Sequence, residues 1–204
     1  MKRLIDIVIS LIALIILSPI FILIAYKVSK NLGAPVFFLQ ERPGKNGKIF
    51  KMIKFRSMKD AIDQDGNLLP DEERITPFGH KLRSTTLDEM PQLFNVLKGD
   101  MSIVGPRPQL VDFMKHYTPR QMRRHEVRPG MTGLAQISGR NNLSWEDKFE
   151  LDVEYVETHN IWLDFKIMFK TVLVILKKEG INSPDQLVGA SRFSGSPKKD
   201  EVQY

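Results

Sequence analysis

Residues Arg83 to Pro108 read RSTTLDEMPQLFNVLKGDMSIVGPRP, and the rest of the chain is best interpreted outward from this stretch. Two adjacent carboxylates, Asp88 and Glu89, stand just before a short apolar helix pattern that stops at Gly99. A loop follows and ends in GPRP, so that an arginine returns shortly after the acid pair. This arrangement is typical of a functional site rather than of a packing element.

The acid pair has two structural interpretations. Thr86-x-x-Glu89 matches a capping box, in which the Glu89 side chain would bond back to the Thr86 amide. Pro91 favours another register, because proline prefers the first helical position, and this would place the cap at Met90. In either register both carboxylates lie at a helix start, where the helix dipole stabilises their anionic form.

The same geometry also allows catalysis. A carboxylate can attack phosphorus and form an acyl-phosphate, which divides one displacement into two steps. A neighbouring carboxylate can hold Mg²⁺, which prefers oxygen ligands and bridges the oxygens of a diphosphate. Basic side chains would then neutralise the transferred phosphoryl group, and those available are Lys54, Arg83, Arg107 and Arg140. The pattern alone leaves capping and catalysis open.

The composition limits the chemistry and the partners. The chain has 204 residues and no cysteine, which excludes disulfides, thiolate nucleophiles and thiolate metal sites. Its formal charge of +6 favours an anionic partner, which could be nucleic acid, a phosphorylated metabolite or an acidic membrane surface. Between residues 107 and 140 there are seven basic and two acidic residues, a local excess of five charges. A solvated basic face is the competing explanation of that excess.

The apolar run Ile7–Tyr26 predicts a membrane element. Twenty residues reach roughly 30 Å as a helix, which is enough to cross a bilayer core. The run is longer than the apolar part of a secretory signal, and no A-x-A cleavage pattern follows it, so we expect it to be retained.

Two features of this run favour a re-entrant helix. Proline removes a backbone donor, so the helix should break or kink at Ser18–Pro19, where the serine hydroxyl can bond a freed carbonyl. Basic residues flank both ends and would hold both on the cytoplasmic side; they are Lys2, Arg3, Lys27 and Lys30. A kinked helix that spans the membrane is the alternative.

Residues Val36–Phe55 predict a β-hairpin. The segments VFFLQ and KIFKMIKF flank ERPGKNG, whose Pro-Gly and Asn-Gly pairs are strong turn signals. In the second strand, alternation places Lys54 and Arg56 on one face, where both can contact an anion. Two solvated charges on an edge strand are the competing explanation.

The segment His125–Arg140 predicts a binding loop. It contains three glycines, which let a backbone approach a ligand closely, and Arg128 and Arg140 bracket it. We therefore expect it to frame a nucleotide or a phosphate, although it contains no Walker A pattern.

The remaining patterns are helical and complete the expected fold. Ser144 should cap one helix, and residues 160–178 form a second, in which Trp162, Phe165 and interleaved lysines suit a membrane interface. A core helix of a soluble domain is the alternative for the second. We expect an α+β, mainly α, fold: a re-entrant membrane helix (residues 1–30), a cytosolic catalytic domain (31–178) with interfacial amphipathic helices, and a carboxy-terminal tail (179–204).

Four motifs carry a resemblance to a known family: KFRSM (54–58), LDEMPQLFNVLKGDMS (87–102), GPRP (105–108) and RPGMTGLAQ (128–136). In this order they resemble the bacterial sugar transferases, which are monotopic polyprenyl-phosphate phosphoglycosyl transferases. The chain is similar to the small members of this family, which consist of the catalytic core, such as the initiating enzymes of Campylobacter-type N-linked glycan assembly. One departure is Met90, where leucine or isoleucine is usual and the substitution is conservative.

The resemblance implies a reaction and roles for several residues. A sugar-1-phosphate would move from a UDP-sugar to polyprenyl (undecaprenyl) phosphate with release of UMP, as in EC class 2.7.8, and so initiate glycoconjugate synthesis. Asp88 would be the nucleophile that forms a covalent aspartyl-phosphosugar, Glu89 would hold Mg²⁺, and the membrane helix would break at Ser18–Pro19. The cationic residues that we expect at the substrate are Lys54, Arg56, Arg83, Arg107, Arg128 and Arg140.

The resemblance also implies partners and a location. The partners would be a UDP-sugar, polyprenyl phosphate, the lipid bilayer and downstream glycosyltransferases, with no nucleic acid. The enzyme would be monotopic at the cytoplasmic face of the bacterial inner membrane. Two other functions fit parts of the sequence: a basic adaptor that binds anionic lipid or nucleic acid, and a direct glycosyltransferase that releases UDP.

Overall fold

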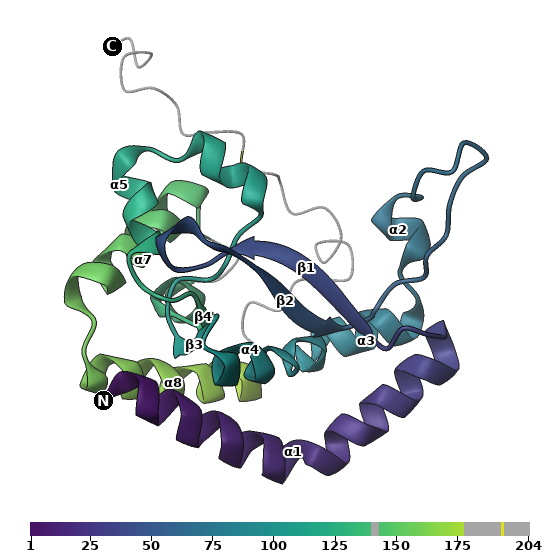
Figure 1. The fold of residues 1–204 in the computed structure, drawn as a ribbon, viewed down its shortest axis with the longest axis horizontal. Helices are drawn as coiled ribbons and strands as arrows, with labels where there is room; N and C mark the ends of the chain where they lie inside the picture. Colours follow the sequence, from purple (N-terminus) through teal and green to yellow (C-terminus); the bar gives the residue numbers. More distant parts are fainter. Residues whose placement is uncertain (140–142, 178–192, 194–204) are drawn as a thin grey trace. The chain divides into compact units, whose positions relative to one another are not determined.

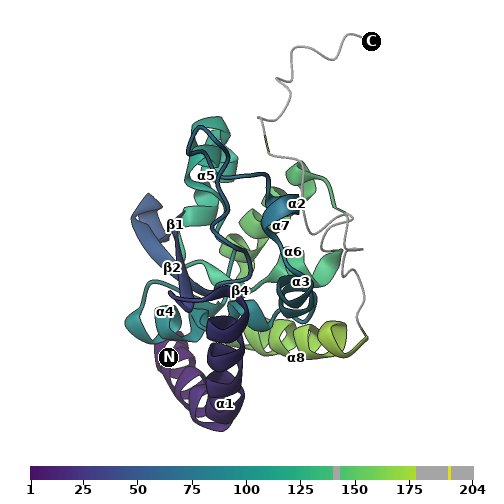
Figure 2. The same cartoon turned by 90° about the vertical axis from the view of Figure 1, so that its right-hand side faces the viewer.

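The computed structural model describes residues 1–139, 143–177 and 193. Within these residues the chain forms two compact units, and each is described by itself (Figures 1 and 2). The first unit contains Met1–Gln40 and Lys51–Gly99, and the second contains Glu41–Phe50 and the described residues from Asp100 onward. The chain passes between the units along a β-hairpin, whose strands are β1 (Phe37–Pro43) and β2 (Ile49–Phe55), joined by the turn η1 (Lys45–Gly47).

Helix α1 (Lys2–Leu32) is continuous, and it bends near its middle (Figure 1). Pro19 lies inside the helix and has no amide hydrogen to donate to the carbonyl of Ile15, four residues earlier. The Ser18 hydroxyl donates to that carbonyl over 2.8 Å. The predicted local repair is therefore confirmed, whereas the predicted break between two helices is a bend within one helix.

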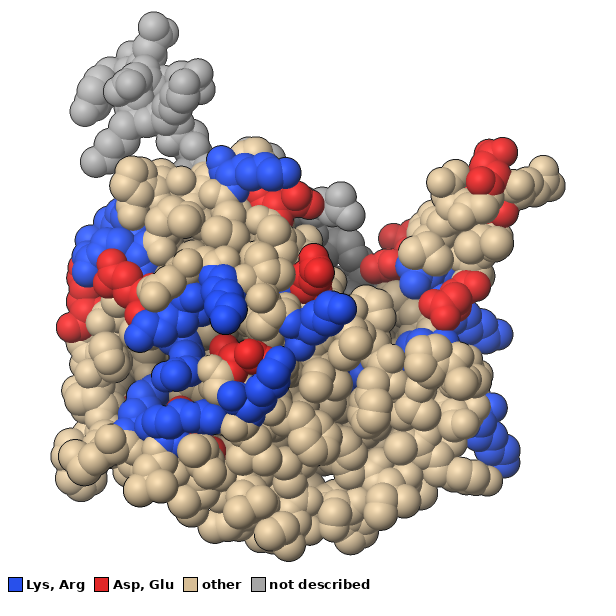
Figure 3. All heavy atoms as spheres, viewed as in Figure 1, with Lys and Arg blue, Asp and Glu red and all other residues tan. Residues whose placement is uncertain are grey.

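The outer surface of α1 is apolar and exposed. Most of its large hydrophobic side chains outside the packed stripe are open, including Leu4, Leu11, Ile12, Ile15, Ile16, Ile22 and Leu23. The surface over α1 in Figure 3 accordingly carries few charged side chains. Among the described residues, α1 is the one helix long and apolar enough to cross a membrane, by length and composition.

The inner stripe of α1 builds the core of the first unit. Ile24 and Val28 are buried against Phe55 of β2, Leu82 and Met90. The other helices and turns of this unit are α2 (Asp71–Arg74), α3 (Pro77–Ser84), η2 (Leu87–Glu89) and α4 (Gln92–Lys98).

Arg3 joins the start of α1 to the end of α4. Its guanidinium donates to the carbonyl oxygens of Val96 and Leu97, the second over 2.7 Å. Carbonyls at a helix end lack partners within the helix, and the negative end of the helix dipole favours a cation. Arg3 thus satisfies the carboxy-terminal carbonyls of α4, which ends at Gly99 in the left-handed conformation.

The second unit is mainly helical around a parallel pair of short strands. Strand β3 (Ser102–Val104) pairs with β4 (Gly130–Thr132). The helices and turns of this unit are η3 (Val111–His116), α5 (Pro119–Met122), η4 (Arg123–His125), α6 (Leu134–Ser138), α7 (Trp145–Thr158) and α8 (Ile161–Lys177). Ser144 caps α7 as expected, because its hydroxyl accepts from the Asp147 amide over 3.0 Å.

Helix α8 is amphipathic. Asp164 and Ile167 are buried, and the Tyr155 hydroxyl donates to the Asp164 carboxylate over 2.6 Å. The opposite stripe exposes Trp162, Phe165, Phe169, Val172 and Leu173 at helical spacing. The described part of α8 therefore packs one face in the core of the second unit and exposes an apolar face, a form that suits a membrane interface.

We predict that Arg3→Ala lowers the free energy of unfolding by about 1–3 kcal/mol, because the Leu97 carbonyl loses the Arg3 donor and the Val96 carbonyl keeps only the Gly99 amide. Chemical unfolding in detergent micelles would measure the change. The matched control is Lys27→Ala, which removes an exposed cation from the same helix and should change stability by less than about 0.5 kcal/mol. Equal effects of the two substitutions would contradict the Arg3 contact.

Candidate active site

The acid pair lies on the short turn η2, which contains Leu87, Asp88 and Glu89. The residue before it, Thr86, has φ 56° and ψ 12°, in the left-handed region that non-glycine residues rarely adopt. Strain of this kind is concentrated at functional sites, where the surrounding structure holds the backbone in place.

Neither predicted cap is formed. The Thr86 side chain makes no capping bond, and its hydroxyl instead donates to the Thr85 carbonyl over 2.7 Å. The capping box of Thr86 with Glu89 is therefore wrong, because Thr86 is left-handed rather than extended and its amide donates to the Arg83 carbonyl over 2.9 Å. Pro91 itself is the amino-terminal cap of α4, one residue later than the predicted cap at Met90.

Apolar neighbours hold the turn on the core of the first unit. Leu87 and Met90, which flank the acid pair, pack in the cluster formed with Ile24 and Val28 of α1. Asp88 lies between them and is 7% exposed. The carboxylate is thus sheltered from water, although it belongs to a turn.

Lys54 and Glu89 form an ion pair beside Asp88. The Lys54 ammonium donates to Glu89 Oε1 over 2.9 Å, and both side chains are more than four-fifths buried. Lys54 is thus not a solvated charge on an edge strand, and its predicted contact with substrate stays a prediction. The pair fixes the carboxylate of Glu89, the residue that follows Asp88 in the chain.

The side chain of Asn95, which sequence analysis missed, fixes the strand segment that leads to Lys54. Asn95 of α4 is 1% exposed; its side chain accepts from the Ile53 amide over 3.0 Å and donates to the Lys51 carbonyl over 2.8 Å. It therefore acts as a strand partner for β2 just before Lys54. The sequence did contain a signal for this role: Asn95 stands inside an apolar helix pattern, and a buried amide must find hydrogen-bond partners.

Two other predicted cations of the first unit contact protein groups. The Arg83 guanidinium donates to Ser57 Oγ over 3.0 Å and to Met58 Sδ over 3.4 Å. Arg56 is buried and donates to the carbonyls of Leu32 and Ala34 and to Asp60. These contacts give Arg56 a structural role at the end of α1, and they differ from the predicted contact with substrate.

The glycines of the predicted binding loop serve backbone packing. A Cβ on Gly130 would lie 2.1 Å from the Gly105 amide nitrogen, and one on Gly133 would lie 2.2 Å from the Gly105 carbonyl oxygen. Only glycine therefore allows the segments that carry β3 and β4 to approach this closely. Arg128 stands just before Gly130 in the chain, and Arg140 lies outside the described residues.

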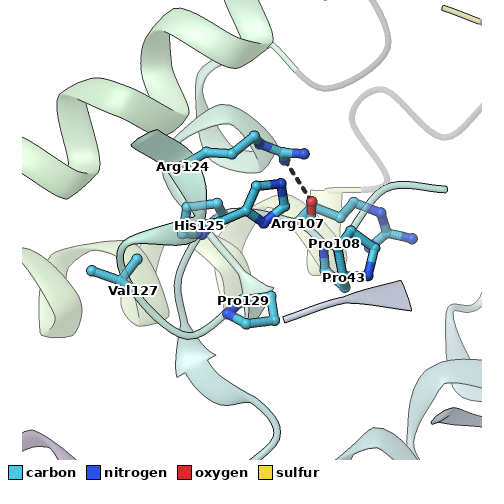
Figure 4. A pocket seen from close by; sticks show the side chains of 8 residues that line it. Pro43, Arg107, Pro108, Arg124, His125, Val127 and Pro129 are labelled. Carbon is cyan, nitrogen blue, oxygen red and sulfur yellow. Dashed lines mark hydrogen bonds between the residues drawn. The ribbon is translucent and has the colours of Figure 1, made fainter. Parts of the chain in front are cut away.

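Arg107 lines a shallow hollow of the second unit that is partly open to solvent (Figure 4). Its walls are Pro43, Pro106, Arg107, Pro108, Arg124, His125, Val127 and Pro129. Burial, with a smaller contribution from the Arg124 charge, lowers the pKa of His125 to about 4. The imidazole is therefore neutral near pH 7 and adds no charge to this wall.

Comparison with known proteins identifies the family. The sequence model described as bacterial sugar transferase matches residues 1–178. The chain belongs to the bacterial sugar transferase family. This confirms the family predicted from the four motifs. One member, the uncharacterized sugar transferase EpsL of Bacillus subtilis, is 52% identical over 196 residues, which cover 96% of each chain.

Named members of the family transfer sugar phosphates to a lipid carrier. The undecaprenyl-phosphate galactose phosphotransferase of Salmonella typhimurium is 41% identical over 197 residues, which are 88% of this chain and 41% of that one. The UDP-glucose:undecaprenyl-phosphate glucose-1-phosphate transferase of Klebsiella pneumoniae is 44% identical over 182 residues, 84% of this chain and 39% of that one. The chain thus spans about two fifths of the length of these two relatives.

We predict that glycine at position 86 is more stabilising than alanine, by about 1 kcal/mol. Both substitutions remove the threonine side chain, and only glycine relieves the left-handed strain. At the exposed interior position Lys81 of α3 the order should invert, with alanine better by about 1 kcal/mol. Unfolding curves of the four variants would measure this. An alanine preference at both positions would show that Thr86 is not left-handed in solution.

Proposed function

We propose that this protein is a phosphoglycosyl transferase that moves a sugar-1-phosphate from a UDP-sugar to polyprenyl phosphate, with undecaprenyl phosphate as the acceptor, and releases UMP. The observation that carries the proposal is the buried Asp88 beside the Lys54–Glu89 ion pair, in a family whose named members act on such substrates. The reaction belongs to EC class 2.7.8 and initiates the assembly of a glycoconjugate.

The proposed reaction has two displacements at phosphorus. An Asp88 carboxylate oxygen attacks the sugar-bearing phosphorus of the UDP-sugar, and the bond from that phosphorus to the bridging oxygen breaks as UMP leaves with the electron pair. A phosphate oxygen of polyprenyl phosphate then attacks the same phosphorus, and the bond to Asp88 breaks. The products are a polyprenyl-diphosphate sugar and the regenerated carboxylate.

The environments of the two carboxylates support Asp88 as the nucleophile. Glu89 shares its Oε1 with the Lys54 ammonium, which lowers the electron density available for attack. Asp88 is sheltered, and exclusion of water slows hydrolysis of an acyl-phosphate before the acceptor arrives. The two residues therefore suit different tasks, although they are neighbours in the chain.

The carboxylates fit the Mg²⁺ ion that the family implies. Among the described residues no group of three or more His, Cys, Asp or Glu side chains could hold a metal ion. Mg²⁺ often binds through only one or two carboxylates together with substrate phosphates and water, and Glu89, next to Asp88, offers such oxygens. When bound, the ion would neutralise charge on the diphosphate. We assign the remaining phosphate charge to the cationic residues Lys54, Arg83, Arg107, Arg128 and Arg140.

Both ends of α1 are hydrogen-bonded within the first unit, which supports a re-entrant helix. Arg3 donates to the Leu97 carbonyl of α4, and Arg56, just after β2, donates to the Leu32 carbonyl. A straight helix of 31 residues is about 46 Å long, so a single span would separate its ends across the bilayer and break one of these contacts.

We place the protein at the cytoplasmic face of the bacterial inner membrane as a monotopic enzyme. The exposed aromatic stripe of α8 would lie in the headgroup region, where Trp and Phe favour the boundary between lipid and water. Downstream glycosyltransferases would use the lipid-linked product as their acceptor.

We predict that the purified protein, incubated with UDP-sugars labelled at the β-phosphate, releases UMP and retains label on Asp88 before any acceptor is added. Mass spectrometry of peptides would locate the label, and nucleotide chromatography would identify the product. Asp88→Asn should abolish both signals, whereas Asp65→Asn, a matched loss of an exposed carboxylate, should change neither.

Other outcomes of this experiment would overturn the proposal. A need for both substrates together would exclude the covalent step, and release of UDP would indicate a direct glycosyltransferase. Binding to anionic vesicles with no nucleotide product, and unchanged by Asp88→Asn, would indicate an adaptor.

We predict that both ends of α1 lie on the cytoplasmic side. Because the chain has no cysteine, single cysteines inserted before Lys2 and after Lys30 give unambiguous labelling sites. A membrane-impermeant maleimide should label both in inverted vesicles and neither in intact spheroplasts. Labelling of the two sites from opposite sides would establish a single span and exclude the re-entrant helix.

A further inference from the structure

Arg124, which is almost completely buried in the second unit, holds the loop that carries Arg107. The Arg124 guanidinium donates to Asp152 Oδ2 over 2.6 and 3.1 Å and to the Tyr117 hydroxyl over 2.7 Å. It also donates to the backbone carbonyl oxygen of Arg107 over 2.7 Å, the contact drawn as a dashed line in Figure 4. The rings of Tyr117 and Phe149 lie within 5.5 Å of the guanidinium carbon.

Stability alone does not account for this pair. The side chains of Arg124 and Asp152 are 1% and 3% exposed, and removing two charges from water costs about as much as their attraction returns. Arg120 and Arg123 already join the same region to α7 through exposed ion pairs with Glu150 and Glu157. The exposed pairs therefore already connect this region to α7, without the desolvation cost of the buried Arg124–Asp152 pair.

Within the described part of the chain, Arg124 hydrogen-bonds the Arg107 loop, whereas Arg120 and Arg123 bond glutamates. In Gly105–Pro108 the residues on both sides of Arg107 are prolines, which have no amide hydrogen. Such a loop has few donors of its own, so its carbonyls are the groups by which it can be fixed. The Gly130 amide bonds the Pro106 carbonyl over 2.9 Å, and Arg124 bonds the next carbonyl.

We infer that Arg124, braced by Asp152 and Tyr117, is a positioning residue that orients Arg107 toward the diphosphate of the nucleotide sugar. This inference rests on the proposed function, in which Arg107 binds phosphate. Arg124 acts through the backbone: with two successive carbonyls fixed and φ restricted at both prolines, the Arg107 side chain leaves the loop in one direction.

A double-mutant cycle tests the inference. Arg124→Lys keeps the charge and loses the planar fork that reaches three partners at once. It should raise KM for the UDP-sugar, and Kd for UDP, about tenfold, which is within the coupling range of interacting residues. In an Arg107→Ala background the same substitution should have almost no effect, because the side chain it positions is gone.

Two further variants keep the test decisive. Tyr117→Phe removes one brace and keeps the ring, so it should fold and raise the same constants about threefold, again only when Arg107 is present. Arg120→Lys alters an exposed arginine of the same region and should change nothing. Circular dichroism would confirm that each variant is folded.

The outcomes separate this inference from the proposed function. Penalties of Arg124→Lys or Tyr117→Phe that add to that of Arg107→Ala would make Arg124 purely structural and overturn the inference, even if the wild-type enzyme releases UMP. Absence of UMP release from every UDP-sugar would overturn the proposed function. In that case UDP binding, measured by calorimetry over the same cycle, still decides whether Arg124 and Arg107 are coupled.

Discussion

The candidate site depends on the packing of an acidic turn on a helix that is otherwise apolar and exposed. Leu87 and Met90 flank Asp88, and both contact the cluster that Ile24 and Val28 build along the inner stripe of α1. Burial of such side chains contributes about 1.5–3 kcal/mol each, and here it holds the turn that carries Asp88 on the core. The helix that is long and apolar enough to cross a membrane therefore also supports the acidic turn.

Short elements explain why long polar side chains hold so much of this backbone. Helix α4 has seven residues and β3 has three, and elements of this length leave most of their terminal amides and carbonyls without partners. Arg3 bonds the end of α4 and Asn95 bonds β2, whereas Arg56 and Arg124 bond carbonyls of loop segments. Some of the basic residues counted along the sequence therefore stabilise the backbone. Only the other basic residues are available to bind an anionic substrate.

The sequence was most informative where one physical signal dominates. Periodicity and turn chemistry predicted the hairpin, α7, α8 and the bend at Pro19, because apolar spacing and proline act locally. It was misleading at Thr86, where the capping pattern competed with a left-handed backbone that tertiary packing imposes. At Gly130 the glycine allows close backbone packing against Gly105, and the predicted binding role of this loop stays a prediction. Asn95 and Arg124 were missed because their partners, Lys51 and Arg107, are distant in sequence.

The bend in α1 gives the membrane attachment a consistent physical basis. In lipid an unpaired carbonyl costs several kcal/mol, so a proline there needs a local donor, and the Ser18 hydroxyl supplies one to Ile15. Arg3 and Arg56 hold the two ends on the unit that carries Asp88. Under the proposed function the acceptor phosphate lies at the membrane surface. A helix that enters, bends and returns would then fix the depth of the nucleophile relative to that surface, which a single span joined at one end would leave variable.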